Sequence, residues 1–422
     1  MADILIYALL LAIFLFEWLF VVGLGSRVLA WTPEIVSFIL MIYIPLRAMK
    51  TKRFGLSGKY IILWTLYSAN VFCGFLINGV SAGPMFAGMR VYFKFIPMFF
   101  LPFLVEFDEK RTKRLLRLIM IGALIQLPVT TWQRFFAKAD RFVGDFAGGT
   151  IGYNTSGVLA LFLMSVMCFL VTFYLSKRIG TWHFVIGAIA LLAPNMMNET
   201  KISFVLLPFA FILPTIILIL RKRVTKRIVI VGIFCAGSFI VFVSVYNLLI
   251  EREIGPKIEE YLTKPEILDE YADRRLMPIL AAIKHSTKDT KEFFFGYGAG
   301  NVSESFTEGL KGRYGKAFAK YRVGQVAFTQ LIWEIGLFGV FVFFSIVVMV
   351  FFDALRCSSK MGFWGAFCLG MVCCCGVFGF SFFYSAILNQ NIAMYIFFLL
   401  AGIVASQRQR EIRAAGQESA AS

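Results

Sequence analysis

The sequence has few charged residues and almost no histidine. Charged residues make up 16% of the 422 residues, and the only two histidines are His183 and His285. An ordinary soluble domain carries roughly 25% charged residues, so this composition argues against a soluble protein. With two histidines, no serine–histidine–acid triad can be recognised. The eight cysteines form no CxxC pair and have no histidine nearby, which argues against a zinc site or a structural disulfide.

Apolar residues are abundant instead, at 59% of the chain. They form runs of about 20 residues, long enough to cross a bilayer as helices. We expect an all-α polytopic membrane protein with about twelve transmembrane helices in a single integral membrane domain, residues 1–422. The first run is too long for the apolar region of a cleavable signal peptide, so none is expected. The predicted spans lie near residues 4–25, 32–48, 59–80, 84–105, 115–134, 152–175, 182–198, 201–220, 228–250, 327–352, 361–383 and 387–405.

The net charge of +17 is concentrated in alternate loops. One such loop is the basic stretch Arg221 to Arg227, and the loops of the other parity carry few basic residues. The positive-inside rule then places both termini in the cytoplasm, with residues 406–422 as a cytoplasmic tail. Residues 251–324, between spans nine and ten, form the one large loop on the opposite side.

This loop contains "FFFGYGAGN", residues 293–301, whose closely spaced glycines are reminiscent of a phosphate-binding loop. No Lys-Ser/Thr pair follows them, and a site outside the cytoplasm would meet no ATP, so a nucleotide site is rejected. The segments Ile254–Leu262 and Asp273–Lys284 have the spacing of amphipathic helices that lie on a membrane surface. Interfacial helices without any chemistry are the plain alternative. The stripe of the second helix consists of Leu276, Ile279, Leu280 and Ile283.

Cations also occur inside or beside the predicted spans. Arg90 and Lys94 are four residues apart within one span, and Lys201 begins another beside Glu199. Charges within a membrane are functional candidates by default, although a lysine at the end of a span often only snorkels. If these cations converge, their natural ligand is a lipid-linked phosphate or diphosphate, and they could stabilise a departing diphosphate electrostatically.

Four features together resemble the superfamily of Wzy-type O-antigen polymerases and O-antigen ligases. The first is the topology, with about twelve spans and one large late loop. The second is "GGTIGYNTSGVLALFL", residues 148–163, which enters a span through Gly149, Thr150, Gly152 and Asn154. The third is "RRLMPILAAIKH" at 274–285 followed by the glycine segment, and the fourth is "QVAFTQLIWEIGLFG" at 325–339. The resemblance covers roughly residues 140–340.

The resemblance implies inverting, metal-independent glycosyl transfer from an undecaprenyl-diphosphate-linked glycan, so no cofactor and no metal are expected. Arg274 or Arg275 matches the loop arginine that contacts diphosphate, and Lys201 replaces an arginine that usually opens its helix. Gln325 stands nine residues before Glu334, where the ligases often have histidine. Glutamine cannot accept a proton as a base, so this departure favours a polymerase.

The general base remains open among Glu199, Asp273, His285 and Glu334, with catalysis by leaving-group stabilisation alone as a further alternative. The expected catalytic residues are Arg274, Arg275, Gln325 and Glu334. The expected residues for binding the diphosphate or the glycan are Arg90, Lys94, Asn154, Glu199, Lys201, His285 and Tyr297.

We therefore expect a polymerase of O-antigen, capsule or exopolysaccharide repeat units in the bacterial inner membrane, with its active site facing the periplasm. Its expected partners are the lipid-linked glycan and membrane lipid, with a flippase and a chain-length regulator as further candidates and no nucleic acid. The alternatives are a ligase that moves glycan onto lipid A core, another lipid-dependent glycosyltransferase, and a flippase or other transporter. The single long loop argues against a flippase.

Overall fold

The fold is helical throughout the part of the chain that this computed structural model describes. That part comprises residues 2–16, 18–19, 22–24, 31–51, 55, 57–136, 147–198, 200–250, 265–303, 308–318 and 323–421. Every described residue lies in a helix, a turn or an irregular connection, and none of them lies in a strand. The expected all-α polytopic membrane protein is confirmed at this level.

Nine helices in the described residues are long and apolar enough to cross a membrane. The count becomes ten if α6 (Ala82–Phe93) and α7 (Ile96–Leu104), which meet at a 45° bend, form one broken span. Two of the twelve predicted spans correspond to shorter apolar helices: Ile4–Leu15, which joins α1 to a π-helix, and α10 (Thr181–Met197). The nine long helices are α4 (Thr32–Thr51), α5 (Gly58–Ile77), α8 (Glu109–Phe135), α9 (Ser156–Leu175), α11 (Ile202–Leu220), α12 (Lys226–Ile250), α17 (Ala327–Cys357), α18 (Phe363–Ser381) and α19 (Asn391–Ala421).

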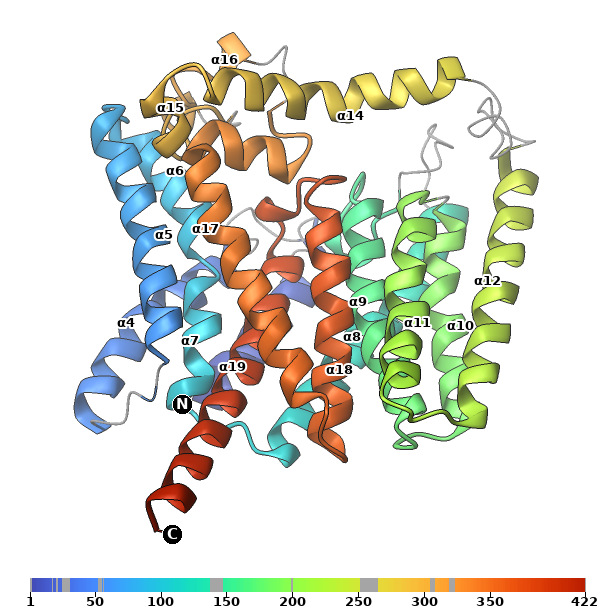
Figure 1. The fold of residues 1–422 in the computed structure, drawn as a ribbon. Coiled ribbons are helices and arrows are strands. Elements are labelled where there is room, and N and C mark those ends of the chain that lie inside the picture. Colours follow the sequence, from blue (N-terminus) through green and yellow to red (C-terminus); the bar gives the residue numbers. More distant parts are fainter. Residues whose placement is uncertain are drawn as a thin grey trace. The chain divides into compact units, whose positions relative to one another are not determined.

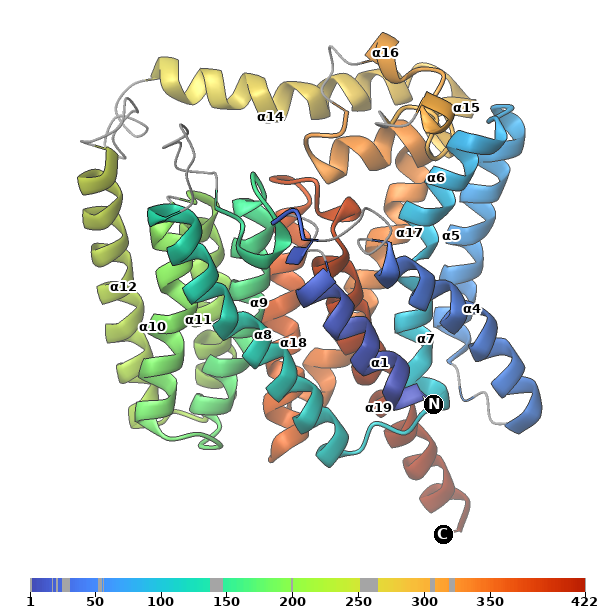
Figure 2. The same cartoon turned by 180° about the vertical axis from the view of Figure 1, so that it is seen from behind.

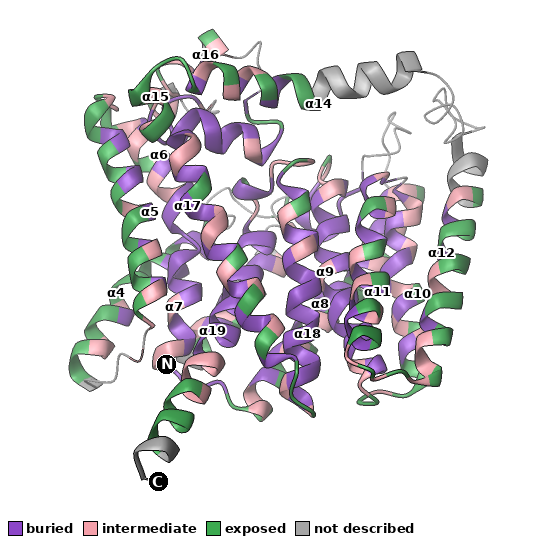
Figure 3. Ribbon diagram, in the orientation of Figure 1, coloured by how far each residue is buried: buried purple, intermediate pink, exposed green. Residues whose placement is uncertain are grey.

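The chain forms two compact units, of which the first comprises residues 1–36, 105–264 and 351–380. Its central helix is α9, against which α10 and α11 pack (Figure 2). Figure 3 shows α9 almost entirely buried, whereas α12 exposes most of its surface. A helix that is apolar on all sides and buried on all sides lies inside a bundle, while the apolar exposed face of α12 is suited to lipid. Cys373, Cys374 and Cys375 of α18 are buried, as expected for small apolar side chains.

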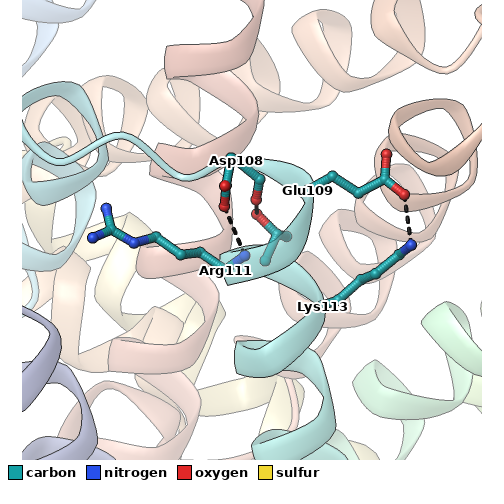
Figure 4. A network of polar contacts seen from close by, with 5 residues as sticks. Asp108, Glu109, Arg111 and Lys113 are labelled. Carbon is teal, nitrogen blue, oxygen red and sulfur yellow. Dashed lines mark hydrogen bonds and ion pairs between the residues drawn. The ribbon is translucent and has the colours of Figure 1, made fainter.

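Helix α8 begins at a capped and charge-paired first turn (Figure 4). The Asp108 carboxylate accepts a hydrogen bond from the Arg111 backbone N–H at 2.7 Å, which satisfies one of the free donors of the helix start. Glu109 and Lys113, one turn apart, form an exposed ion pair at 2.6 Å. This geometry is that of a solvated charge run at "EFDEK", residues 106–110.

The second unit comprises residues 37–104, 265–350 and 381–422. Helix α19 packs along α7, and the short helix α15 (Thr290–Phe295) packs against α5. Aromatic side chains fill the space between the helices: Phe95 stacks on Phe398 with 4.5 Å between ring centroids, and Trp64 contacts both rings. Helix α14 (Pro265–Ser286) runs across the end of the unit where α15 and the start of α17 lie (Figure 1).

Several local expectations can be compared with the structure. Helix α14 contains the predicted Asp273–Lys284 helix but begins at Pro265, a residue suited to a first helical position. Its apolar stripe is divided, because Ile279 is buried while Leu276 and Leu280 are each 57% exposed. The predicted helix at 254–262 lies outside the described residues. Helix α19 continues to Ala421, so the segment expected as a tail after residue 405 is helical.

Candidate active site

The Glu334 carboxylate is buried in α17 and accepts hydrogen bonds from four groups. The Tyr92 hydroxyl donates to Oε2 at 2.7 Å, and the Ser303 hydroxyl donates to Oε1 at 2.5 Å. Nε2 of Gln330, one turn earlier, lies 3.4 Å from Oε2, and the Gly300 backbone N–H also donates to the carboxylate. A carboxylate surrounded only by donors matches the ionised form. Within the described part of the chain, Glu334 makes no ion pair.

Neutral amides connect Glu334 to the buried cation Lys94. The Lys94 ammonium donates to Oδ1 of Asn391 at 2.8 Å and to the Asn389 carbonyl at 3.1 Å. The Asn389 amide donates to Oε1 of Gln330 at 3.2 Å, and Gln330 reaches Glu334. Buried charges need hydrogen-bond partners. These amides provide partners for the Lys94 ammonium and the Glu334 carboxylate in one network, although the two charged groups do not contact each other. The Glu334 network is defined here as Tyr92, Lys94, Ser303, Gln330, Glu334, Asn389 and Asn391.

The cation of this network occupies a break between two helices. Helix α6 ends at Phe93 and α7 begins at Ile96, so Lys94 lies between them. The Ser37 hydroxyl donates to the Lys94 carbonyl, which a continuous helix would have used for its own hydrogen bond. Arg90 and Lys94 were expected on one face of one helix. Instead Arg90 lies half-buried in the last turn of α6, and Lys94 lies just beyond that helix.

Helix α17 is itself interrupted two residues after Glu334. Gly336 has φ 72° and ψ 172°, outside the helical region. The Trp333 carbonyl accepts a hydrogen bond from the Tyr297 backbone N–H at 2.7 Å, which ties the glycine segment to the interruption. A Cβ on Gly296 would lie 2.8 Å from the Gly336 nitrogen, so the two backbones meet where only glycine fits.

The three glycines of "FFFGYGAGN" all adopt positive φ angles, of 58°, 89° and 78°. A Cβ on Gly300 would lie 2.0 Å from the Pro84 carbonyl oxygen in α6. Two amides hold the segment: Asn70 of α5 donates to the Phe294 carbonyl, and Asn78, just after α5, donates to the Gly296 carbonyl. The segment therefore forms a tight turn, and this turn carries the Gly300 N–H to Glu334.

Aromatic side chains adjoin this turn and form an aromatic cluster around Trp333. The ring centroids of Phe318, His285 and Tyr297 lie 4.6, 5.1 and 5.6 Å from that of Trp333. Tyr314 adjoins Tyr297 at 5.2 Å. Burial raises the pKa of Tyr297, and its 2.6 Å hydrogen bond to Glu292 raises the pKa further, so the phenol stays protonated as a donor.

Three further predicted residues belong to the second unit. Gln325 is exposed in the turn before α17, so the glutamine that reaches Glu334 is Gln330. Arg274 and Arg275 lie in α14, but their side chains fall outside what the structure describes. No group of three or more potential metal ligands occurs among the described residues.

The remaining predicted residues belong to the first unit. Asn154 is exposed with φ 60°, just after a buried turn at Gly149 and Thr150. Gln126 and Gln133 of α8 hold that turn, each through a donor and an acceptor, at 2.8 to 2.9 Å. Lys201 is half-buried as the first residue before α11. Glu199 lies outside the described residues.

The sequence analysis missed Tyr92, Ser303, Gln330, Asn389 and Asn391. One signal was available, because Gln330 and Glu334 are four residues apart and therefore share a face of an apolar helix. The other partners come from distant segments and carry no local signal. In comparisons with known proteins, no family model and no curated protein matches the chain.

Proposed function

We propose that this protein polymerises oligosaccharide repeat units linked to undecaprenyl diphosphate into a surface polysaccharide such as O-antigen, capsule or exopolysaccharide. The reaction takes place on the periplasmic side of the bacterial inner membrane. The observation that carries the proposal is the Glu334 network, a buried carboxylate and a buried ammonium held beside the glycine turn of a polytopic membrane protein.

Glu334 is proposed as the general base. Its Oε1 atom accepts a 2.5 Å hydrogen bond from the Ser303 hydroxyl, an alcohol in the position that an acceptor sugar hydroxyl would take. A base must lie within hydrogen-bond reach, about 2.6–3.2 Å between heavy atoms, of the group whose proton it abstracts, and an alcohol oxygen in place of Ser303 would lie within that reach. The acceptor oxygen attacks the anomeric carbon, its proton passes to Glu334, and the bond to the diphosphate breaks with inversion.

Cations are proposed to stabilise the diphosphate as it leaves. Lys94 belongs to the same hydrogen-bond network as Glu334. The group that removes the proton and the cation that stabilises the negative charge on the leaving diphosphate are therefore connected. Arg274 and Arg275 are proposed to bind the diphosphate, because guanidinium groups form paired hydrogen bonds with phosphate oxygens. The mechanism as proposed requires no metal.

The aromatic cluster is proposed as part of the glycan-binding surface. Tyrosine, histidine and tryptophan present an apolar ring face together with a polar group, which suits the mixed surface of a sugar. His285, Tyr297, Tyr314 and Phe318 are each partly exposed, so their rings are available to a ligand on that side. The cluster adjoins the glycine turn that contacts Glu334 through Gly300.

Deletion of the gene in its native host tests this proposal. Lipid-linked oligosaccharides and surface glycans from the deletion strain would be separated by size. A polymerase predicts that single repeat units accumulate and long chains disappear. Long chains that persist on undecaprenyl diphosphate without reaching their acceptor would indicate a ligase. Unchanged glycans, or repeat units trapped on the cytoplasmic side, would contradict both and favour a transporter.

A further inference from the structure

The turn between α10 and α11 in the first unit buries an unusual number of polar side chains. It spans residues 195–203, "NMMNETKIS", where the sequence singled out Glu199 and Lys201 but none of the uncharged polar residues. Four polar residues in it expose no surface at all: Asn195, Asn198, Thr200 and Ser203. None of them belongs to the Glu334 network, and none carries a charge.

Most of the polar side-chain atoms of these four residues have no hydrogen-bond partner. Both amide atoms of Asn195, both amide atoms of Asn198 and the Ser203 hydroxyl make no hydrogen bond in the structure. The Thr200 hydroxyl reaches the Asn198 carbonyl only at 3.5 Å. Leaving one buried polar group unsatisfied costs about 1–3 kcal/mol, so five such atoms in one turn require an explanation.

The backbone holds these side chains within a small region. The Thr200 N–H donates to the Asn195 carbonyl at 3.3 Å, and the Ser203 N–H donates to the Thr200 carbonyl at 3.0 Å. Asn195 and Asn198 are three residues apart at the end of α10, so they share a face of that helix. Both α10 and α11 pack on α9, which fixes the turn at one end of this helix group.

The chemistry of the unpartnered atoms selects a class of ligand. Two amide N–H₂ groups donate, two amide carbonyls accept, and the Ser203 hydroxyl can do both. A metal cation would leave the N–H₂ groups unsatisfied, and an anion would leave the carbonyls unsatisfied. Neighbouring hydroxyl groups of a neutral sugar both donate and accept, so they can satisfy the whole set.

We propose that the Asn195 and Asn198 amides and the Ser203 hydroxyl bind hydroxyl groups of a neutral sugar in the lipid-linked glycan. This inference rests on the proposed function and deepens it, because it assigns sugar recognition to residues that have no part in the Glu334 network. Since these atoms expose no surface, the three side chains must become accessible when the sugar enters. A bound water molecule donates and accepts hydrogen bonds in the same way as a sugar hydroxyl. The following experiment distinguishes a sugar from bound water.

The test uses Asn195→Leu and Asn198→Leu, which nearly preserve side-chain size and remove every polar atom. The full-length protein in nanodiscs would be titrated with two probes, and the dissociation constants would be measured by thermal shift. The first probe is the lipid-linked repeat unit extracted from the deletion strain, and the second is undecaprenyl diphosphate. Ser203→Ala provides a smaller change if a leucine variant fails to fold. Thr215→Val is the matched control, because that hydroxyl already donates to the Phe211 carbonyl within α11.

We expect each leucine variant to bind the repeat-unit lipid at least tenfold more weakly and undecaprenyl diphosphate with unchanged affinity. Without ligand, these variants should be as stable as the wild type or more stable, because unpaired amides have been removed. Ser203→Ala should weaken only the first probe, and Thr215→Val neither. Leucine variants that bind the repeat-unit lipid with unchanged affinity would overturn this inference but not the proposed function. Leucine variants that are less stable than the wild type without ligand would also overturn it, because the amides would then be bonded to water. A wild type that binds both probes equally would overturn the proposed function as well.

Discussion

The Tyr92 hydroxyl donates a 2.7 Å hydrogen bond to the Glu334 carboxylate, joining two residues that are 242 positions apart in the chain. Tyr92 lies two residues before the break between α6 and α7, and Glu334 lies two residues before the interruption of α17. The bond therefore connects the two irregular helices of the second unit close to the points at which each departs from helical geometry. Discontinuous helices in membrane proteins commonly line binding sites, because freed backbone groups are tolerated there.

Removing the Tyr92 hydroxyl should destabilise the protein more than removing the hydroxyl of the neighbouring Tyr67. Tyr92→Phe takes one donor from a buried carboxylate, and a hydrogen bond to a charged group contributes about 1.5–3 kcal/mol. Tyr67→Phe is the matched control, because Tyr67 is equally buried but donates to a neutral carbonyl, that of Tyr92, at 3.2 Å. Its expected cost is about 0.5–1.5 kcal/mol. Unfolding in detergent measures both, and equal losses would contradict an ionised Glu334.

Replacing the proposed base should abolish turnover. Glu334→Gln keeps the size of the side chain but cannot accept a proton, so the polymerisation rate should fall by roughly 10²-fold or more. The exposed Glu109→Gln, in the ion pair with Lys113, is a control for loss of a carboxylate and should leave the rate unchanged. Rates would be compared at equal amounts of folded protein. A Glu334→Gln protein that retains more than a tenth of the rate would exclude Glu334 as the base.

Ser303→Ala should have a different effect from Glu334→Gln. The Ser303 hydroxyl occupies Oε1 of Glu334 at 2.5 Å, so its removal leaves that atom open to the acceptor sugar. The expected result is a retained or increased rate at low acceptor concentration, measured as kcat/KM for the acceptor. Complete loss of activity in a folded Ser303→Ala protein would show that the serine is itself required. That result would contradict the proposal that the acceptor hydroxyl replaces the Ser303 hydroxyl at Glu334.

The sequence predicted the helical segments well, because an apolar run of sufficient length defines a span regardless of its neighbours. It could not predict the break at Lys94, which lies inside one continuous apolar run. The sequence singled out Glu334 only through the resemblance. It placed Gln325 in the site, whereas Gln330 reaches Glu334, since positions four apart on a helix share a face and positions nine apart do not.

Tertiary contacts decide the rest of the network. Asn389 donates to Gln330 across 59 positions, and no local pattern marks either residue as a partner of the other. The glycine segment is the opposite case, because three glycines in five positions predict positive φ angles from local chemistry alone, and all three have them. The unpartnered amides of Asn195 and Asn198 could not have been predicted from sequence, since they are defined by burial.

Alanine at Gly300 should disrupt the glycine turn. Gly300 has φ 78°, which costs a residue with a Cβ about 1–2 kcal/mol, and that Cβ would lie 2.0 Å from the Pro84 carbonyl oxygen. We expect Gly300→Ala to lower the unfolding temperature and to abolish polymerisation, because the Gly300 N–H would move away from Glu334. Gly309→Ala is the control, since a Cβ there would meet nothing within 4 Å. Equal stability of both variants would contradict the described turn.

Lys94→Met should impair binding of the diphosphate as well as stability. The change removes the ammonium from Asn389 and Asn391 and leaves two buried acceptors without their donor, at about 1–3 kcal/mol for each. We expect the dissociation constant for undecaprenyl diphosphate to rise at least tenfold. The exposed Lys113→Met is the control, with an effect below about 1 kcal/mol. Lys94→Met protein that is destabilised but binds the diphosphate normally would limit Lys94 to a structural role.

The central claim is the proposal that this protein elongates a glycan on undecaprenyl diphosphate. The most direct measurement is to reconstitute the purified protein into liposomes that contain the lipid-linked repeat unit, with EDTA present, and to follow the size of the glycan with time. We predict a ladder of lipid-linked chains with release of undecaprenyl diphosphate, and no ladder with Glu334→Gln. Repeat units that stay single with the wild-type protein, while a known polymerase elongates its own substrate under the same conditions, would contradict the claim.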